Sequence, residues 1–262
     1  MYFEWHGSAN PNAPVVVCSS GLGGAAQFWS PQLKALSADY RVLLYDHKGT
    51  GRSPAPLPDD YTIAQMAEEL LSLLVSLAVS RCHFIGHALG GLVGLRMAYV
   101  KPSLFDSLIL INAWASANPH TLRCFAIRKS ILANCEASVF LKMQSLLLYP
   151  PDYIAEHADL LEQEEARHEA HFPDKTNLLA RISALSMFDM QAQLPEINTP
   201  ILVLANKDDA LVPWQQSKVL ADGLPHGQLH LCDYGGHAST VTTPDKINTI
   251  LLDYLNQATR KH

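Results

Sequence analysis

Six apolar runs recur along the chain, and each is followed by a longer stretch with helical character. They cover residues 14–20, 40–46, 82–87, 108–112, 201–206 and 228–233. The runs are continuously apolar and rich in Val, Ile and Leu, which is typical of parallel strands covered by helices on both faces. The alternation of strands and helices predicts an α/β fold with a mostly parallel sheet flanked by helices.

One intervening helix has a clear start signal. Within residues 60–79, Thr62 is placed as an N-cap and Gln65 follows three residues later, at the head of an amphipathic run. This spacing indicates a capping box, in which each side chain accepts a hydrogen bond from the backbone N–H of the other residue. We expect a helix here that returns the chain to the next strand.

The strand pattern is interrupted between the fourth and fifth apolar runs. From about residue 113 to 192 the sequence is helical, and it includes the charged run 157–172. The strand pattern then resumes at Ile201. We therefore expect a core formed by residues 1–112 and 193–262, with residues 113–192 inserted as an all-helical lid.

Composition narrows the class of protein. About half of the 262 residues are apolar, which is enough to bury a full core. The formal net charge is −6 and no Lys/Arg cluster is longer than the terminal RKH, so nothing indicates binding to nucleic acid or an anionic membrane. The N-terminus lacks a signal-peptide pattern, and no window reaches the roughly 18 apolar residues of a membrane span. We expect a cytoplasmic protein with a small-molecule substrate and no nucleic-acid or membrane partner, and a homodimer is compatible with the sequence.

The cysteines give no sign of metal or disulfide chemistry. Their number is odd and they are scattered, without a CxxC pair, so we expect them to be reduced and mostly buried. They are Cys18, Cys82, Cys124, Cys135 and Cys232.

A glycine-rich segment after the first apolar run has two interpretations. Gly21, Gly23 and Ala26 fit a dinucleotide fingerprint, and Asp46 ends the next strand near where a ribose-binding acid belongs. However, Pro31 would interrupt the helix that this fingerprint requires. The alternative is the loop of an α/β hydrolase whose backbone N–H groups face an oxyanion, and it predicts further motifs downstream.

Those motifs are present in the expected order. GHALGG (86–91) matches a nucleophile elbow with Ala88 at the nucleophile position, Asp209 follows a strand, and His237 follows the last strand. Each lies at the C-terminal end of a strand, which is the edge where open parallel sheets bind ligands. Adjacent Asp208 is an alternative to Asp209, which could instead cap a helix, and His237 could be a structural turn residue.

Other patterns are weaker. His168 and His171 are three residues apart, whereas the HExxH zinc motif needs four, so a charged helix face is the preferred interpretation. GTGRS (49–53) follows a strand but lacks the GK[ST] of a phosphate-binding loop. We expect no metal and no cofactor.

The motifs together resemble a known family. GLGG, YDHKGTG, GHALGG, DDALVP and YGGHA are similar to the α/β-hydrolase superfamily across the whole chain. YTIAQMAEEL, NPHTLRCF, LLLYP and NLLARISAL resemble the aminoacrylate or carbamate hydrolases of the Rut pyrimidine-utilisation pathway, whose members carry alanine in the elbow. The resemblance implies a role in uracil catabolism, either conversion of 3-aminoacrylate to malonic semialdehyde and ammonia or hydrolysis of carbamate. One departure is Lys48, where such hydrolases more often have arginine, which puts a local salt bridge in doubt.

An elbow without a nucleophile restricts the chemistry. Removing the serine of a serine hydrolase costs on the order of 10⁶ in kcat, while a positioned acid–base group still contributes about 10²–10⁴. The acid–base contribution alone is sufficient only for a substrate that already hydrolyses by itself. We therefore expect Asp209 and His237 to act directly on water, with Ala88 leaving space for it. The backbone N–H groups of Leu22 and Leu89 are expected where an oxyanion hole normally lies.

Three arginines are candidates for binding a substrate carboxylate: Arg123, Arg128 and Arg181, although each is individually more typical of a surface residue. Two other functions stay open. The chain could be a serine esterase with an engineered serine-to-alanine change in the elbow, since GHSLGG is one substitution away. It could also be a non-catalytic binding protein, but the presence of both Asp209 and His237 counts against this.

Overall fold

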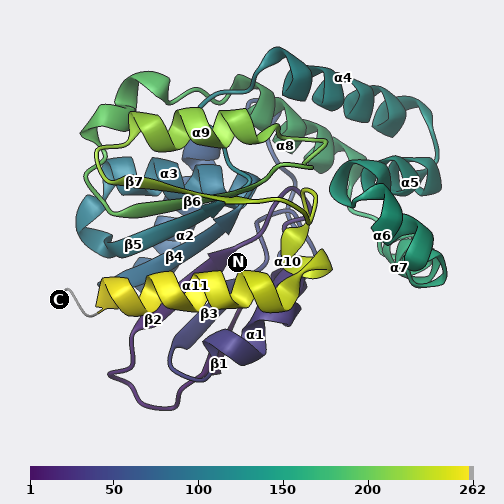
Figure 1. Ribbon diagram of the computed structural model, residues 1–262. Helices are drawn as coiled ribbons and strands as arrows, with labels where there is room; N and C mark the ends of the chain where they lie inside the picture. The colour runs from purple at the N-terminus through teal and green to yellow at the C-terminus, as the bar shows by residue number, and fades with distance from the viewer. Residues whose placement is uncertain (260–262) are drawn as a thin grey trace.

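The computed structural model describes residues 1–259, and the terminal RKH at 260–262 lies outside the described residues. Its centre is a seven-stranded sheet with the order β1-β3-β2-β4-β5-β6-β7 (Figure 1). The strands are β1 (Phe3–Gly7), β2 (Val15–Ser19), β3 (Arg41–Tyr45), β4 (Cys82–His87), β5 (Phe105–Ile111), β6 (Ile201–Asn206) and β7 (Gly227–Cys232). All neighbours pair in parallel except β1 and β3, which are antiparallel. The predicted α/β class and each of the six predicted strands are confirmed.

The seventh strand, β1, was not among the predicted strands. Its sequence FEWHG is only half-buried because it lies at an edge of the sheet. An edge strand does not need the continuous apolar run of a central strand, so the pattern used for prediction does not detect it.

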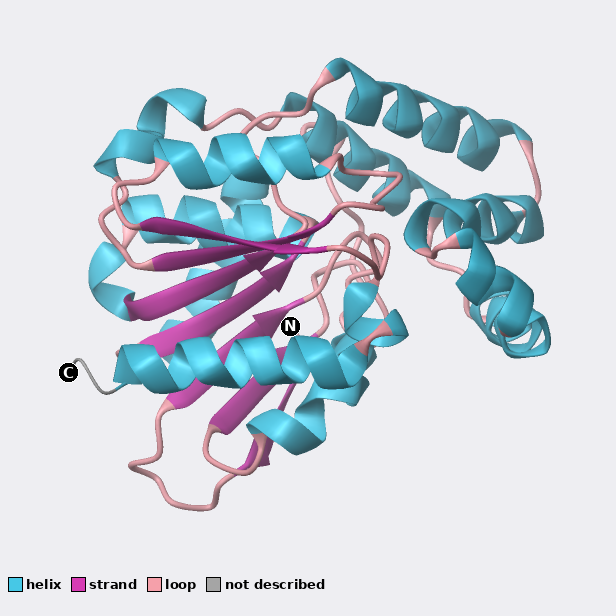
Figure 2. Cartoon of the chain, in the orientation of Figure 1, coloured by secondary structure: helices cyan, strands magenta, loops and turns pink. Residues whose placement is uncertain are grey.

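Helices cover both faces of the sheet (Figure 2). The larger buried cluster joins one face to α2 (Ile63–Ser76), α3 (Leu89–Val100) and α9 (Trp214–Gly223). The other cluster joins the opposite face to α1 (Ser30–Leu36) and α11 (Pro244–Thr259). The core also contains the short helix α10 (Ser239–Thr242) and three 3₁₀ turns, at Ala26–Trp29, Pro102–Leu104 and Gln191–Glu196. No helix of residues 1–259 is long and apolar enough to cross a membrane.

The predicted capping box is confirmed at the start of α2. The Thr62 hydroxyl accepts a hydrogen bond from the backbone N–H of Gln65 at 3.2 Å, and the Gln65 side chain accepts one from the backbone N–H of Thr62 at 2.8 Å. Buried residues at helical spacing then attach α2 to α3 and the sheet. The local sequence therefore determines both where this helix begins and which face it buries.

Five helices lie between β5 and β6 and form a layer at one end of the sheet, which we call the cap. They are α4 (Pro119–Asn134), α5 (Ala137–Leu148), α6 (Pro151–Glu156), α7 (Ala158–Ala170) and α8 (Lys175–Met187). The parallel strands point toward this layer, so the loops at their C-terminal ends lie beneath it (Figures 1 and 2).

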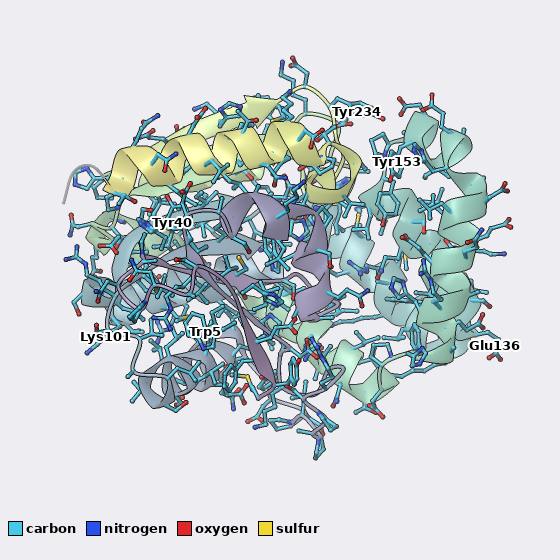
Figure 3. The ribbon with its side chains drawn as sticks, turned by 90° about the horizontal axis from the view of Figure 1, so that it is seen from below. Trp5, Tyr40, Lys101, Glu136, Tyr153 and Tyr234 are labelled. Carbon is cyan, nitrogen blue, oxygen red and sulfur yellow. The ribbon has the colours of Figure 1, made fainter. Side chains whose placement is uncertain are left out.

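Contacts from α8 and from the corner between α5 and α6 help to join the cap to the core. On α8, the Asn177 side chain donates to the carbonyls of Gly49 and Ala55 and accepts from the N–H of Leu57. At the corner between α5 and α6, the Leu148 carbonyl accepts from the N–H of Ala238 at 3.0 Å. Figure 3 shows Tyr153 of α6 and Tyr234 of the β7–α10 loop near this second junction. The cap is thus attached directly to the loop that carries His237.

Candidate active site

Ala88 lies in a sharp turn between β4 and α3. Its φ of 46° and ψ of −111° are unusual for a non-glycine residue, and such a conformation costs on the order of 1–3 kcal/mol. The turn also requires glycine on either side. A Cβ at Gly86 would lie 2.6 Å from the Gly90 carbonyl oxygen, and a Cβ at Gly90 would lie 2.1 Å from the Ser19 carbonyl oxygen. The strand, sharp turn and helix expected of an elbow are all present, with a methyl group at the nucleophile position.

Asp209 and His237 form a buried pair. Nδ1 of His237 lies 2.7 Å from Oδ2 of Asp209, and the two side chains are 3% and 0% exposed. The other carboxylate oxygen, Oδ1, accepts from the backbone N–H groups of Leu211 and Val212, both at 2.8 Å. Because the carboxylate accepts the proton of Nδ1, the lone pair of neutral His237 lies on Nε2. This arrangement gives a histidine oriented to act as a general base.

Asp208 has a different role from its neighbour. Its two carboxylate oxygens accept from the backbone N–H groups of Gly235 and Gly236, each at 3.0 Å. Asp208 therefore holds the loop that precedes His237, while Asp209 contacts the His237 ring. Of the two aspartates that the sequence left open, Asp209 is the one placed on the histidine.

The expected oxyanion-type donors come from two elements next to the elbow. Leu89 is the first residue of α3, and the first N–H groups of a helix have no acceptor within the helix. Leu22 lies in the loop after β2, where the N–H of Gly24 closes a turn onto the Gly21 carbonyl at 3.0 Å. The structure places Leu22 in the loop after β2 and Leu89 at the start of α3, and their role as donors stays a prediction.

Arg128 is a buried cation without an acidic partner. It lies on the inner face of α4 and is 3% exposed. Its Nη2 donates to Gln144 of α5 at 3.0 Å, its guanidinium lies 5.7 Å from the centre of the Phe140 ring, and its Nε is buried without an acceptor. No carboxylate of residues 1–259 forms an ion pair with it. Burial lowers the pKa of Arg128 to about 10, so the group remains charged at neutral pH.

The start of α4 lies against the loop that carries Asp209. Thr121 donates to the Leu211 carbonyl at 3.2 Å, so the start of α4 rests on the loop that follows Asp209. Cys124 lies one turn further along the same face of α4. Burial raises the pKa of its thiol. The charge of Arg128 lowers this pKa, and the charge of Asp209 raises it. Cys124 is therefore within electrostatic reach of both charged groups, and Arg128 follows it by one turn.

The other two arginines are placed differently. Arg181 on α8 is 1% exposed, and its guanidinium donates to the carbonyls of Leu22 and Lys48 and to the hydroxyl of Thr50. Burial lowers its pKa to about 10. Its Nη atoms thus hold the loop after β2 and the turn after β3 against the cap. Arg123 lies on the exposed face of α4. The structure does not bring the three arginines together.

Two residues near His237 were not predicted as functional. His87, at the end of β4, donates from Nε2 to the His237 carbonyl at 2.8 Å, and its ring centre lies 4.8 Å from that of His237. Asn112, just after β5, donates from Nδ2 to the same carbonyl at 2.7 Å. In the sequence, His87 is one residue of the GHALGG motif and has no separate signal. The available signal in the sequence was a polar residue at the end of one strand and another directly after the neighbouring strand.

The alternatives weighed from sequence are accounted for by local contacts. Asp46 accepts from the N–H of Ala26 at 2.8 Å and from the Arg52 side chain, and α1 begins at Ser30, so the dinucleotide interpretation was rightly set aside. Lys48 forms an ion pair with Glu69 at 3.0 Å. Within residues 1–259, no group of three or more His, Cys, Asp or Glu side chains is arranged to hold a metal ion.

Comparison with known proteins agrees with this geometry. Residues 13–128 match the sequence profile of the alpha/beta hydrolase fold. The chain is 55% identical over 97% of its length to a RutD protein of Stutzerimonas stutzeri, covering 96% of that protein. It is 53% identical over 99% of its length to a RutD protein of Pseudomonas savastanoi, covering all of it. Both relatives carry the words carbamate hydrolase in their names.

Solved structures are similar over nearly the whole chain. A hydrolase from Pseudomonas aeruginosa has a TM-score of 0.86 at 29% identity, covering 97% of this chain and 93% of its own. The enol-lactonase from Burkholderia xenovorans has a TM-score of 0.88 at 26% identity, covering 97% of this chain and 96% of its own.

Proposed function

The chain belongs to the RutD family of α/β hydrolases, and we propose that it accelerates hydrolysis of a labile C–N bond in a small carboxylate. The observation that carries this proposal is the Asp209–His237 pair beside an elbow whose central residue is Ala88. A base that is oriented by a carboxylate but has no side-chain nucleophile next to it is suited to activating water. The carbamate in the names of the relatives contains such a C–N bond.

The absence of a nucleophile determines which substrates are suitable. A positioned general base contributes about 10²–10⁴ in rate, well below the total acceleration that a stable amide or ester needs. An enamine or a carbamate already breaks down in water, so this contribution is enough. We propose 3-aminoacrylate as the substrate, as the Rut resemblance implies, with carbamate as the alternative.

The proposed reaction of 3-aminoacrylate begins from its imine tautomer, in which the carbon bearing nitrogen is electrophilic. Nε2 of His237 removes a proton from water as the oxygen bonds to this carbon, and the C=N electron pair moves to nitrogen. The protonated His237 returns this proton to nitrogen, which gives a carbinolamine. His237 then removes the proton of the new hydroxyl group and passes it to nitrogen as the C=O bond forms and the C–N bond breaks. One water is consumed, and malonic semialdehyde and ammonia are released.

For carbamate the same groups would act on a carbonyl carbon. Water activated by His237 adds to it, and the developing oxyanion lies toward the backbone N–H groups of Leu22 and Leu89. Proton return from His237 then allows ammonia to leave with bicarbonate as the other product. Both reactions use one base that becomes the acid, and neither needs a covalent intermediate.

Both substrates carry a carboxylate, and Arg128 is the proposed anchor for it. Burial of a guanidinium without a counter-ion is costly, and Arg128 has an unpaired Nε and no acidic neighbour in the described chain. A substrate carboxylate would supply the missing charge and accept from the guanidinium. Gln144 would keep the guanidinium in place during binding.

The test is ammonia release from 3-aminoacrylate generated in situ, and separately from carbamate, in the presence of wild-type protein, His237→Ala or no protein. We expect acceleration by the wild type and its loss in His237→Ala, with His226→Ala, at an exposed histidine, as the matched control. Equal turnover in wild type and His237→Ala contradicts the proposed mechanism. No acceleration of either substrate by wild type contradicts the proposed function.

A further inference from the structure

Two side-chain donors converge on one backbone oxygen in the candidate site. The carbonyl of His237 accepts from Nε2 of His87 at 2.8 Å and from Nδ2 of Asn112 at 2.7 Å. The three residues are 3% exposed or less. Both lone pairs of the carbonyl are therefore engaged by side chains of the core, which leaves the backbone of His237 little freedom to move.

The donors are held by the sheet itself. His87 ends β4 and pairs with Ile111 of β5, and Asn112 directly follows Ile111. Asn112 has a φ of 51° and its backbone N–H donates to the Leu204 carbonyl of β6 at 2.8 Å, so its position is fixed by the neighbouring strand. The donors thus lie at the ends of two buried central strands of the sheet.

A third strand end extends the network. Nδ2 of Asn206, the last residue of β6, lies 3.3 Å from Oδ1 of Asn112 and 2.8 Å from the hydroxyl of Ser239. Ser239 begins α10, two residues after His237. The consecutive sheet positions β4, β5 and β6 therefore contact the His237 segment both at its carbonyl and just beyond it.

The two donors do not change charge near neutral pH. A carbonyl only accepts hydrogen bonds, so His87 carries its proton on Nε2. Burial, together with the neighbouring His237, lowers the pKa of His87 to about 3. The groups facing His87 are the aromatic ring of Phe28 and the ring and carbonyl of His237. Neutral His87 and the amide of Asn112 therefore act as fixed dipoles.

The segment before His237 explains why such a restraint matters. Gly235 and Gly236 have φ values of 136° and 64°, conformations that glycine adopts readily and that give the loop little stiffness of its own. In a serine hydrolase the histidine is also held through Nε2 by the nucleophile hydroxyl. The methyl group of Ala88 offers no such hydrogen bond, so Asp209 restrains the ring from one side only.

We propose that His87 and Asn112 are positioning residues that hold the backbone of His237 and thereby take over the restraint that a serine hydroxyl provides in related enzymes. They act through His237 and do not contact substrate. This inference rests on the proposed function, because it assigns them to the orientation of its general base. A displacement of a catalytic group by about 1 Å can cost on the order of 10² in rate.

The experiment uses substitutions that remove one donor each with little other change. His87→Phe keeps an aromatic ring beside Phe28 but has no N–H. Asn112→Gly removes the amide while tolerating the positive φ. His83→Phe is the matched control, because His83 is a buried histidine on the same strand that contacts Ser107 instead. For each variant, kcat, KM, melting temperature and the NMR signal of the His237 Nδ1 proton are measured.

We expect kcat to fall roughly ten- to a hundredfold in His87→Phe and Asn112→Gly, with KM nearly unchanged. The Nδ1 proton signal of His237 shifts or broadens in both and stays unchanged in His83→Phe. Adding Ala88→Ser to Asn112→Gly should sharpen the signal again, because a hydroxyl can then hold Nε2.

Two results would overturn the inference. One is an unchanged His237 signal in both variants. The other is a loss of kcat that follows melting temperature equally in the control. The ring signal does not depend on turnover. A wild-type protein that fails to accelerate the reaction would therefore contradict the proposed function, while the His237 signal in the variants still decides the positioning role.

Discussion

Asp209 uses one carboxylate oxygen for the His237 ring and the other for the backbone of its own loop. Oδ2 lies 2.7 Å from Nδ1 of His237, while Oδ1 accepts from Leu211 and Val212. The backbone contacts fix the plane of the carboxylate, so the carboxylate in turn fixes the orientation of the ring. This division between the two oxygens predicts that an amide is a poor replacement.

Asp209→Asn should lower kcat by about 10²–10⁴ with a small effect on folding. An amide N–H directed at Nδ1 favours the tautomer with the proton on Nε2, which removes the base. Ammonia release measures the effect. The matched control is Asp208→Asn, which alters the contacts to Gly235 and Gly236 but not the ring. An equal loss in Asp208→Asn would show that Asp209 has no special role.

Ala88→Ser should create ester-cleaving activity. The elbow backbone and the Asp209–His237 pair are in place, and only the hydroxyl is missing. We expect cleavage of p-nitrophenyl acetate to rise by at least about 10²-fold over wild type. C–N hydrolysis should fall because the hydroxyl occupies the space proposed for water. Ala88→Gly has no hydroxyl and should not gain the activity, and neither should Ala88→Ser combined with His237→Ala.

Arg128→Met should weaken substrate binding without destabilising the fold. Removing a buried charge that has no counter-ion leaves the free energy of unfolding unchanged or higher, despite the lost contact with Gln144. KM should rise, and stabilisation by small carboxylates such as malonate should disappear. For wild type, that stabilisation is about 1.4 kcal/mol at ten times Kd. Arg123→Met, on the exposed face of the same helix, should match wild type in both measurements.

Two buried histidines should make stability fall on mild acidification. Burial is the main cause that lowers the pKa of both His47 and His87 from 6.5 to about 3. Between these values the unfolded chain binds protons that the folded protein does not, so the free energy of unfolding decreases as pH falls. Each histidine contributes a slope of about 1.4 kcal/mol per pH unit well below pH 6.5.

Urea unfolding from about pH 8 to about pH 4 measures this slope. His87→Phe should reduce it because only His47 remains to contribute, whereas His168→Gln, at an exposed position, should leave it unchanged. A slope that is the same in wild type and His87→Phe would contradict the low pKa of His87.

The parts of this protein that were predictable depend on local sequence. Central strands are covered on both faces, so their apolar runs are continuous, and the Thr62 capping box is defined by residues three apart. The elbow, acid and base motifs can also be recognised in the sequence by their order along the chain. In contrast, β1 is a half-buried edge strand that has no such run.

The functional differences among similar residues depended on tertiary contacts. All three arginines lie in helical sequence, and only the packing of α4, α5 and α8 distinguishes them. Arg123 is exposed, Arg128 is buried without an ion-pair partner, and Arg181 donates to backbone carbonyls. Asp208 and Asp209 are adjacent in sequence and are distinguished by the direction of the chain after β6. The donors to the His237 carbonyl lie 150 and 125 positions away from it.

The methyl group of Ala88 also determines whether a covalent intermediate can form at the elbow. Alanine cannot be acylated, so no covalent adduct accumulates at the elbow and no burst of first product precedes steady turnover. Added alcohols or amines cannot intercept an acyl group at this position, because none is formed there. Phosphonylating agents that inactivate serine hydrolases likewise have no target at the elbow. In the proposed function, the reaction is therefore a single displacement by water, in a fold otherwise suited to two.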